Sequence, residues 1–134
     1  MKDYRVLVIG PRRGLIDELR ERRIPFSIWQ NRHVFNVSAG QKSVIAPFWN
    51  SAEKNREQVR KSFSGQRFTH VIAGTESSVL PATIARRLVG ARIANAATGT
   101  RCRDKLHMKQ HLAGFGIPMT RFLEDSPSLD PKQV

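Results

Sequence analysis

Two glycine-containing turns and one carboxylate mark the place where this sequence could bind a ligand. Each turn follows a short β-branched run that is typical of a buried parallel strand. Ligands of open parallel sheets bind outside the carboxyl ends of the strands, and the Glu76 carboxylate could accept a hydrogen bond from an amine or a hydroxyl group. The residues that we expect to bind substrate are Gly10, Pro11, Gly74, Thr75 and Glu76.

The first turn, GPRRG over residues 10–14, matches neither the dinucleotide-binding glycine pattern nor the P-loop. A plain strand-to-helix turn is therefore the favoured interpretation. Arg12 and Arg13 nevertheless stand where sheets of this kind bind ligands.

A histidine pair and a cysteine have side chains capable of chemistry, but ordinary roles explain them better. His107 and His111 have the spacing of metal ligands, yet no third ligand accompanies them. We interpret them as a solvated or capping pair. Cys102 lies between Arg101 and Arg103, which could stabilise a thiolate, but the sequence fixes no partner histidine nearby. The sequence predicts neither a catalytic residue nor a metal ligand.

The composition indicates an anionic partner. Lys and Arg total 23 of the 134 residues against 11 Asp and Glu, which gives a formal net charge of +12. A single cysteine excludes an internal disulfide framework and a multi-cysteine zinc site, and it favours the cytoplasm over secretion. The apolar run at residues 6–9 is too short for a signal sequence or a membrane span, so we expect no membrane partner.

The elements that must position the candidate site alternate between strand and helix. This order predicts an α/β fold, a Rossmann-like open and mainly parallel sheet with helices on both faces. The expected strands are 5–10, 25–30, 69–74 and 91–95, with two short strands, 33–37 and 43–46, around a turn at Ala39-Gly40. The expected helices are 15–23, 50–63, one capped by Ser77 or Ser78 and ended by Gly90, and 104–114 with Asp104 as N-cap.

Three details of these elements are specific enough to test. Leu80, Ile84 and Leu88 are expected to form the buried face of the third helix. The small-residue segment AATGT, residues 96–100, is expected to be a loop. After residue 117 we expect one more strand-like piece and then a Pro- and Ser-containing tail that is typical of a linker.

A series of short motifs follows Val71: the acidic turn at Glu76, then RDK at 103–105, MK at 108–109 and GIP at 116–118. In this order the motifs resemble the start of an ATP-grasp ligase. The first strand, helix and second strand are similar to the Rossmann-like leading domain of that family. The resemblance covers most of residues 4–123 and implies three parts: a leading domain at 1–97, a connecting helix with the start of the ATP-grasp domain at 98–124, and a linker or truncated tail at 125–134.

The resemblance also implies an activity for a longer protein. ATP, with magnesium, would phosphorylate a small carboxylate substrate, and an amine nucleophile would then displace the phosphate. Lys105 matches the family's lysine that reaches the nucleotide phosphates. Independently, a lysine near a helix N-terminus meets the positive end of the helix dipole, and a bound phosphate would resolve that conflict. Because the main catalytic domain is missing, we expect these 134 residues to be a truncated fragment that is inactive alone.

Two rival functions remain open beside the ligase. The first is a basic α/β module that binds nucleic acid, which we consider the weaker because one Tyr and two Trp offer little stacking surface. Its candidate residues are Lys54, Arg56, Arg60, Lys61 and Arg67, near Phe63 and Phe68. The second is a non-catalytic dimerisation or regulatory domain that forms a homodimer through an apolar edge. Its candidate residues are Val34, Phe35, Val44, Ile45 and Phe48.

Overall fold

The computed structural model describes residues 3–92 and 96–120 of the chain. At its centre lies a four-stranded parallel sheet in the order β3-β2-β1-β4. The strands are β1 (Val6–Ile9), β2 (Phe26–Gln30), β3 (Ser43–Ile45) and β4 (His70–Ala73). Every residue of β1 and β2 is buried, as expected of strands that are covered on both faces.

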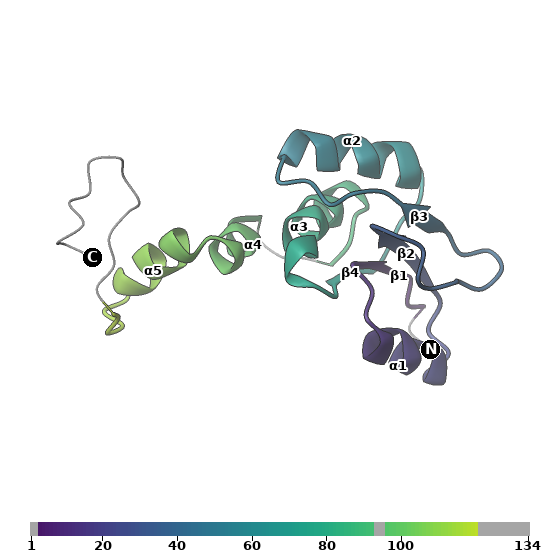
Figure 1. Ribbon diagram of the computed structural model, residues 1–134, viewed down its shortest axis with the longest axis horizontal. Coiled ribbons are helices and arrows are strands. Elements are labelled where there is room, and N and C mark those ends of the chain that lie inside the picture. The colour runs from purple at the N-terminus through teal and green to yellow at the C-terminus, as the bar shows by residue number, and fades with distance from the viewer. Residues whose placement is uncertain (1–2, 93–95, 121–134) are drawn as a thin grey trace.

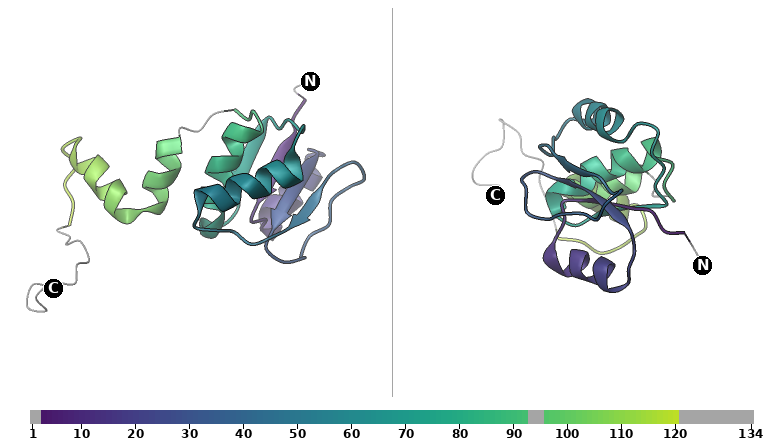
Figure 2. Two further views of the ribbon diagram at one scale, coloured as in Figure 1. Left: turned by 90° about the horizontal axis from the view of Figure 1, so that it is seen from above. Right: turned by 90° about the vertical axis from the view of Figure 1, so that its right-hand side faces the viewer.

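Alternate side chains of β1 pack into two separate hydrophobic cores, one on each face of the sheet. Val6 and Val8 pack with the helix α1 (Arg13–Glu21) on one face of the sheet. Leu7 and Ile9 face the opposite core, which includes side chains of the helices α2 (Ala52–Phe63) and α3 (Val79–Leu88). Figure 2 shows α1 on one side of the sheet and the other two helices on the other side. The predicted Rossmann-like open α/β fold is confirmed.

The strand order places a topological switch point between β1 and β4. From β1 the chain passes through α1 to β2 and β3, and then returns through α2 to β4 on the other side of β1. The helices that follow β1 and β4 therefore lie on opposite faces. In open sheets of this kind, ligands usually bind in a crevice at the carboxyl ends of the two strands that flank the switch point.

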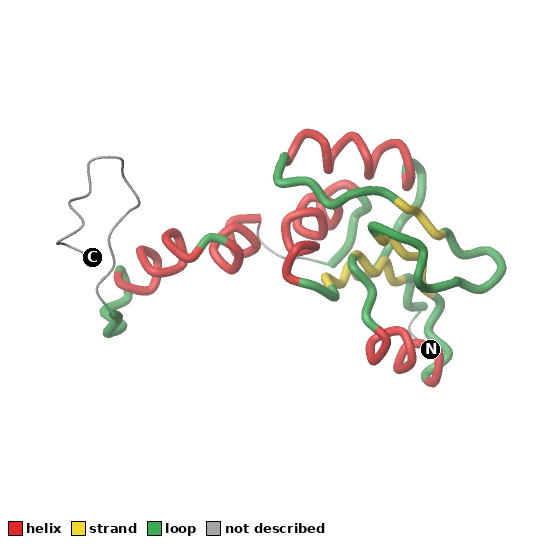
Figure 3. Tube along the Cα trace, in the orientation of Figure 1, coloured by secondary structure: helices red, strands yellow, loops and turns green. Residues whose placement is uncertain are grey.

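Two further helices project from the sheet and its covering helices (Figures 1 and 3), and they form an open, V-shaped hairpin in the left view of Figure 2. They are α4 (Ala96–Arg103) and α5 (Lys105–Ala113). α4 lies against α3 at Gly99, where an added Cβ would come within 2.0 Å of Thr83 Oγ1. α5 has no buried residue, and Phe115 and Ile117 beyond it are exposed. Among the described residues, no helix is long and apolar enough to cross a membrane.

The predicted strand at 33–37 is wrong, because the Gln30 side chain takes the backbone groups that a strand would use. Gln30 Oε1 accepts from the backbone N–H of Val34 and Phe35, and Gln30 Nε2 donates to the Phe35 carbonyl oxygen. β3 pairs in parallel with β2 instead of forming a hairpin. The turn itself is confirmed, with Gly40 in the left-handed region at φ 82°.

The buried face of α3 also differs from the prediction. Ala82, Ala85 and the following Val89 are buried in the core, whereas Leu88 is 39% exposed. Small side chains of α3 fit between α3, α2 and the sheet. The orientation of the helix against these neighbours, and not the size of each side chain, therefore decides which of its residues are buried. The sequence pattern favoured the larger residues, and that preference failed here.

Three expectations concern the connections. Residues 96–100 form the first part of α4, so the predicted loop there is wrong. Neither Ser77 nor Ser78 caps α3 by a side-chain hydrogen bond; a 3-10 helix, η1 (Glu76–Ser78), precedes it with Thr75 as N-cap. Most of the strand expected at 91–95 and most of the piece after 117 lie outside the described residues.

Candidate functional site

The two glycine turns meet at the switch point. Gly74 N donates to Ile9 O at 2.9 Å, and a Cβ added to Gly74 would lie 2.2 Å from the Gly10 carbonyl oxygen. Gly10 has φ +68°, and a Cβ there would lie 2.4 Å from Thr75 Oγ1. Neighbouring atoms of the chain therefore fill the space that each glycine leaves. The glycines let the two strand ends touch, and so place Pro11 and Thr75 side by side.

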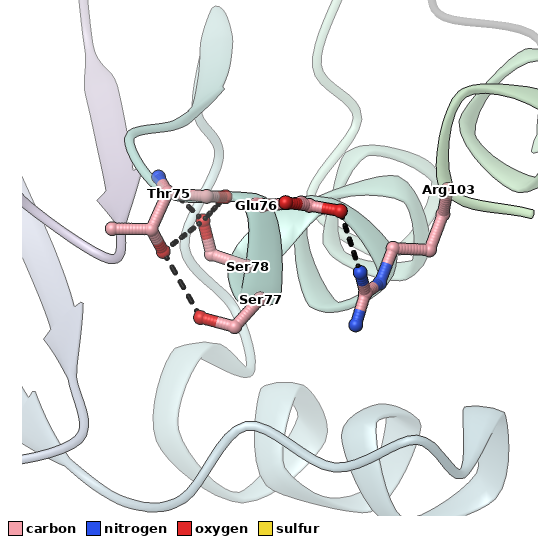
Figure 4. A network of polar contacts seen from close by, with 5 residues as sticks. All are labelled: Thr75, Glu76, Ser77, Ser78 and Arg103. Atoms are coloured by element: carbon pink, nitrogen blue, oxygen red, sulfur yellow. Dashed lines mark hydrogen bonds and ion pairs between the residues drawn. The ribbon is translucent and has the colours of Figure 1, made fainter.

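A hydroxyl network fixes the turn after β4 (Figure 4). Ser78 Oγ donates to the Thr75 carbonyl oxygen at 2.7 Å and accepts from Thr75 N at 3.1 Å. Thr75 Oγ1 contacts Ser77 Oγ at 3.2 Å. Because Ser78 is fully buried, this network holds the backbone on both sides of Glu76 in one conformation.

Glu76 is held out from this network toward solvent, with 76% of its side chain exposed. Its Oε1 accepts from Arg103 Nη1 of α4 at 2.8 Å (Figure 4). Among the described residues between the carboxyl end of each strand and the next α-helix or strand, it is the only acidic one. A carboxylate in this position can receive an ammonium or another cationic donor, and here it receives a guanidinium.

Sequence reasoning did not find Arg103 as a partner of Glu76. The two residues are 27 positions apart, and the contact depends on the packing of α4 against α3, which brings Arg103 beside Glu76. The resemblance drew attention to the RDK segment, but it did not connect this arginine to the acidic turn.

Arg12 and Arg13 provide positive charge beside Gly10 and Pro11. Arg12 is the N-cap of α1 without a side-chain hydrogen bond, Arg13 is its first residue, and both are exposed. No acidic residue occurs in the first turn of this helix. The edge therefore combines one carboxylate with cationic groups, an arrangement that suits a ligand with an amino group and an anionic group.

Lys105 is exposed at the first position of α5. The predicted N-cap, Asp104, is confirmed: its carboxylate accepts from the backbone N–H of Leu106 at 2.9 Å and of His107 at 3.2 Å. That carboxylate already supplies negative charge at this helix end. It therefore offsets the repulsion between the Lys105 ammonium and the positive end of the helix dipole without a phosphate. As a nucleotide contact, Lys105 therefore depends on the resemblance alone.

The described residues do not fit a magnesium site or another metal centre. Within them, no three His, Cys, Asp or Glu side chains gather closely enough to hold a metal ion. His107 Nδ1 lies 3.4 Å from the Asp104 carboxylate, and the His111 ring packs against Phe115 at 5.1 Å. Cys102 is exposed.

The surfaces expected for the two rival functions are smaller than their sequence patterns indicated. For nucleic acid, Phe63 and Phe68 are 2% and 6% exposed and pack edge-to-face, so neither can stack on a base. For the dimer, Val44 is buried, while Phe35 and Phe48 pack against the two cores. Val34 and Ile45 remain exposed, at 56% and 55%.

One arginine outside the crevice has a shifted pKa. Arg86 of α3 is partly buried, and its Nε donates to the Val71 carbonyl oxygen at 3.1 Å. Burial lowers the pKa of the Arg86 guanidinium from its ordinary value. Because an arginine pKa begins so high, the group stays charged at neutral pH, and we assign Arg86 to covering β4.

Comparison with known proteins supports the architecture. No protein-family model matches the sequence, and no curated protein matches it. Among solved structures, the chain is similar to an L-amino acid ligase from Bacillus licheniformis, with a TM-score of 0.72 and 18% sequence identity. The similarity covers 88% of this chain and 30% of that chain. The chain therefore has the fold of a part of that ligase and spans less than a third of its length.

Proposed function

We propose that this chain is the leading, substrate-binding domain of an ATP-grasp carboxylate-amine ligase. In such an enzyme ATP converts a carboxylate into an acyl phosphate, which an amine then attacks. The observation that carries the proposal is the presence of Glu76 at the switch point of a fold shared with an L-amino acid ligase over 88% of this chain. The resemblance of residues 103–118 to the family supports it independently.

The residues of the crevice bind and orient substrate in this proposal. The Glu76 carboxylate receives the amino group of a substrate in place of Arg103. Arg12 and Arg13 attract its anionic group, and the Gly10-Pro11 and Gly74-Thr75 turns form the wall between them. These contacts select a substrate with both charges, and they leave the bond-forming chemistry to residues elsewhere in the enzyme.

ATP and magnesium belong mainly to the remainder of the ligase. Magnesium prefers several oxygen ligands, and the described residues offer no cluster of three. Lys105 is the residue of this chain that we assign to the nucleotide, where its ammonium would contact phosphate oxygens. The domain is then inactive alone, and we place the enzyme in the cytoplasm because the one cysteine of this chain is exposed and unpaired.

The first test is the reading frame beyond Val134 together with the intact mass of the native gene product. We expect roughly 300 or more residues, the size of two or three domains. The native product should consume ATP only when a carboxylate and an amine are both present. A native product that ends at Val134, or ATP consumption that ignores both substrates, would overturn the ligase assignment.

The second test assigns Glu76 its role. In the native product we expect Glu76→Gln to raise the KM of the amine-bearing substrate about tenfold, because one charge-assisted contact is lost. Glu53→Gln is the matched control, since Glu53 is also exposed and also pairs with an arginine, Arg56, on α2. Equal effects of the two substitutions would show that Glu76 has no special contact with substrate.

A homodimer through the edge of β3 is the second candidate function. Ile45 on this strand and Val34 near it are both more than half exposed, and β3 pairs with one strand only, β2, among the described residues. Sedimentation velocity at high concentration should show a dimer that Ile45→Lys dissociates. A monomer for the unmodified chain excludes this arrangement.

A further inference from the structure

A second groove lies along α2, apart from the crevice at the switch point. It has a volume of about 330 Å³ and is lined by Trp49, Lys54, Glu57, Gln58 and Lys61. None of these residues belongs to the crevice described above. The volume is in the range of pockets that hold small organic ligands. In Figure 1, α2 lies at the outer side of the molecule, with α3 between it and the hairpin.

The aromatic wall of this groove is held rigidly from below. Asn55 is fully buried, and its side chain bonds both backbone groups of Trp49: Trp49 N donates to Asn55 Oδ1 at 3.2 Å, and Asn55 Nδ2 donates to Trp49 O at 2.7 Å. The Trp49 ring also contacts the buried Trp29 ring, with centroids 6.4 Å apart. Trp49 itself is only partly buried. A ring fixed in this way offers a stacking surface at little entropic cost.

The rim of the groove carries two free ammonium groups. Lys54 and Lys61 are seven residues apart on α2, about 10 Å along the helix axis. Within the described residues neither forms an ion pair, although Glu57 is three residues from Lys54 and four from Lys61. Both ammonium groups therefore remain available to an anion, and a lysine ammonium is a common phosphate ligand.

The same rim also offers hydrogen-bond acceptors. Gln58 Nε2 donates to Ser62 Oγ at 2.6 Å, which leaves the Gln58 carbonyl oxygen to accept. Glu57, which likewise forms no ion pair within the described residues, adds a carboxylate that accepts only. A ligand that fills this groove must therefore combine a flat ring, an anionic group and an N–H donor.

We propose that this groove binds a nucleoside monophosphate whose base carries an exocyclic amino group. The base stacks on Trp49, its amino group donates to Glu57 or Gln58, and the phosphate pairs with Lys54 or Lys61. The partly exposed Trp49 ring provides for one base, because Phe63 and Phe68 at the exit of α2 are buried. The surface thus suits a mononucleotide, and a nucleic-acid strand would need further stacking positions. This site is independent of the proposed ligase activity.

The test is a titration of the ¹⁵N-labelled chain followed by NMR. The two indole N–H signals report separately, because Trp29 Nε1 donates to the Ala46 carbonyl oxygen inside the core while Trp49 lines the groove. Trp49→Phe assigns the signals. We expect AMP to shift the Trp49 signal saturably and to leave that of Trp29 in place. Adenosine and inorganic phosphate, added separately, should each bind more weakly than AMP.

Two variants of equal charge decide whether binding is specific to the groove. Lys54→Gln with Lys61→Gln should weaken AMP binding about fivefold, the effect of losing the one exposed ion pair that the phosphate forms with either lysine. Arg60→Gln with Arg67→Gln removes the same charge from exposed residues outside the groove and should change the affinity less than twofold. An equal loss in both variants, or no saturation at millimolar AMP, would overturn the proposal.

A change of base tests the proposed contact of the exocyclic amino group with Glu57 or Gln58. Purine riboside monophosphate has a hydrogen where AMP has its exocyclic amino group, and its base carries no N–H donor, so it should bind about fivefold more weakly through the loss of one hydrogen bond. Equal affinities would overturn the role of Glu57 and Gln58 as acceptors. These outcomes do not depend on ATP consumption, so they do not depend on the ligase proposal.

Discussion

Replacement of Gly74 by alanine tests whether the two strand ends need backbone contact. The added Cβ would lie 2.2 Å from the Gly10 carbonyl oxygen and 3.5 Å from Pro11 Cα. These atoms belong to the backbone, so no side-chain rotation relieves the clash. Gly74 is not among the glycines with positive φ, and alanine therefore brings no conformational strain of that kind.

The magnitude follows from this purely steric conflict. Forcing a methyl group into packed structure costs about 1–3 kcal/mol, here through a shift of the β4 end away from β1. With a urea dependence of about 2 kcal/mol per molar for a chain of this size, the unfolding midpoint should fall by about 1 M. The slope should stay the same, since the same surface is exposed on unfolding.

Gly14→Ala is the matched control for this substitution. Gly14 is the second residue of α1, has no atom within 4 Å of an added Cβ, and also lacks a positive φ. The same change there should raise stability by about 0.5–1 kcal/mol through helix propensity. Urea unfolding followed by far-UV circular dichroism measures both variants. Gly74→Ala with the stability of the unmodified chain would refute the close approach of the two strand ends.

Three further substitutions test single contacts. Asn55→Ala should lower the free energy of unfolding by about 2–3 kcal/mol, because both backbone groups of Trp49 lose their buried partner; chemical denaturation measures this. Glu76→Gln should change the melting temperature by less than about 2 °C, since its ion pair with Arg103 is exposed; a larger loss would make the contact structural. Asp104→Ala should cost about 1 kcal/mol of local stability in α5, seen as faster amide exchange there, while the asparagine variant should retain most of the cap.

The sequence was sufficient for the fold because its strands are strongly patterned. The β-branched runs at 6–9 and 70–73 place apolar residues in the cores on both faces of the sheet, and the helix between the first two strands has one apolar stripe. Together with short connections these features leave few topologies other than a parallel sheet. The prediction of the strands also predicts the turns, since each turn begins where a strand ends.

Two wrong predictions, the buried face of α3 and the strand at 33–37, show that a local sequence pattern contains no information about tertiary contacts. The sequence of α3 has two apolar faces, one of leucine and isoleucine and one of alanine and valine. The distance from α3 to α2 and the sheet decides which of the two faces is buried. Residues 33–37 alternate like a strand, but a single side chain, Gln30, satisfies their backbone groups. Both outcomes depend on tertiary neighbours, which override a preference read from adjacent residues.

The sequence predicted where the candidate site lies, but it did not predict all of the residues that meet there. The switch point placed Glu76 and the two glycine turns correctly together, but the glycines contact each other and not open space. Arg103 reaches Glu76 from a helix whose residues were expected to be a loop at its start. Ligand specificity at this edge therefore depends on charged groups, whose meeting requires the complete fold.

The contact between Glu76 and Arg103 also sets a limit on how strongly binding and the α4–α5 hairpin can be coupled. An amine that binds Glu76 in the proposed way must displace Arg103, so substrate and hairpin compete for one carboxylate. The competing ion pair is exposed on both sides, and such pairs contribute about 0.2–1 kcal/mol. By reciprocity, Arg103→Ala should tighten amine binding by no more than about fivefold, and bound amine should loosen the hairpin by the same factor. A larger change would require a second contact between the hairpin and the crevice.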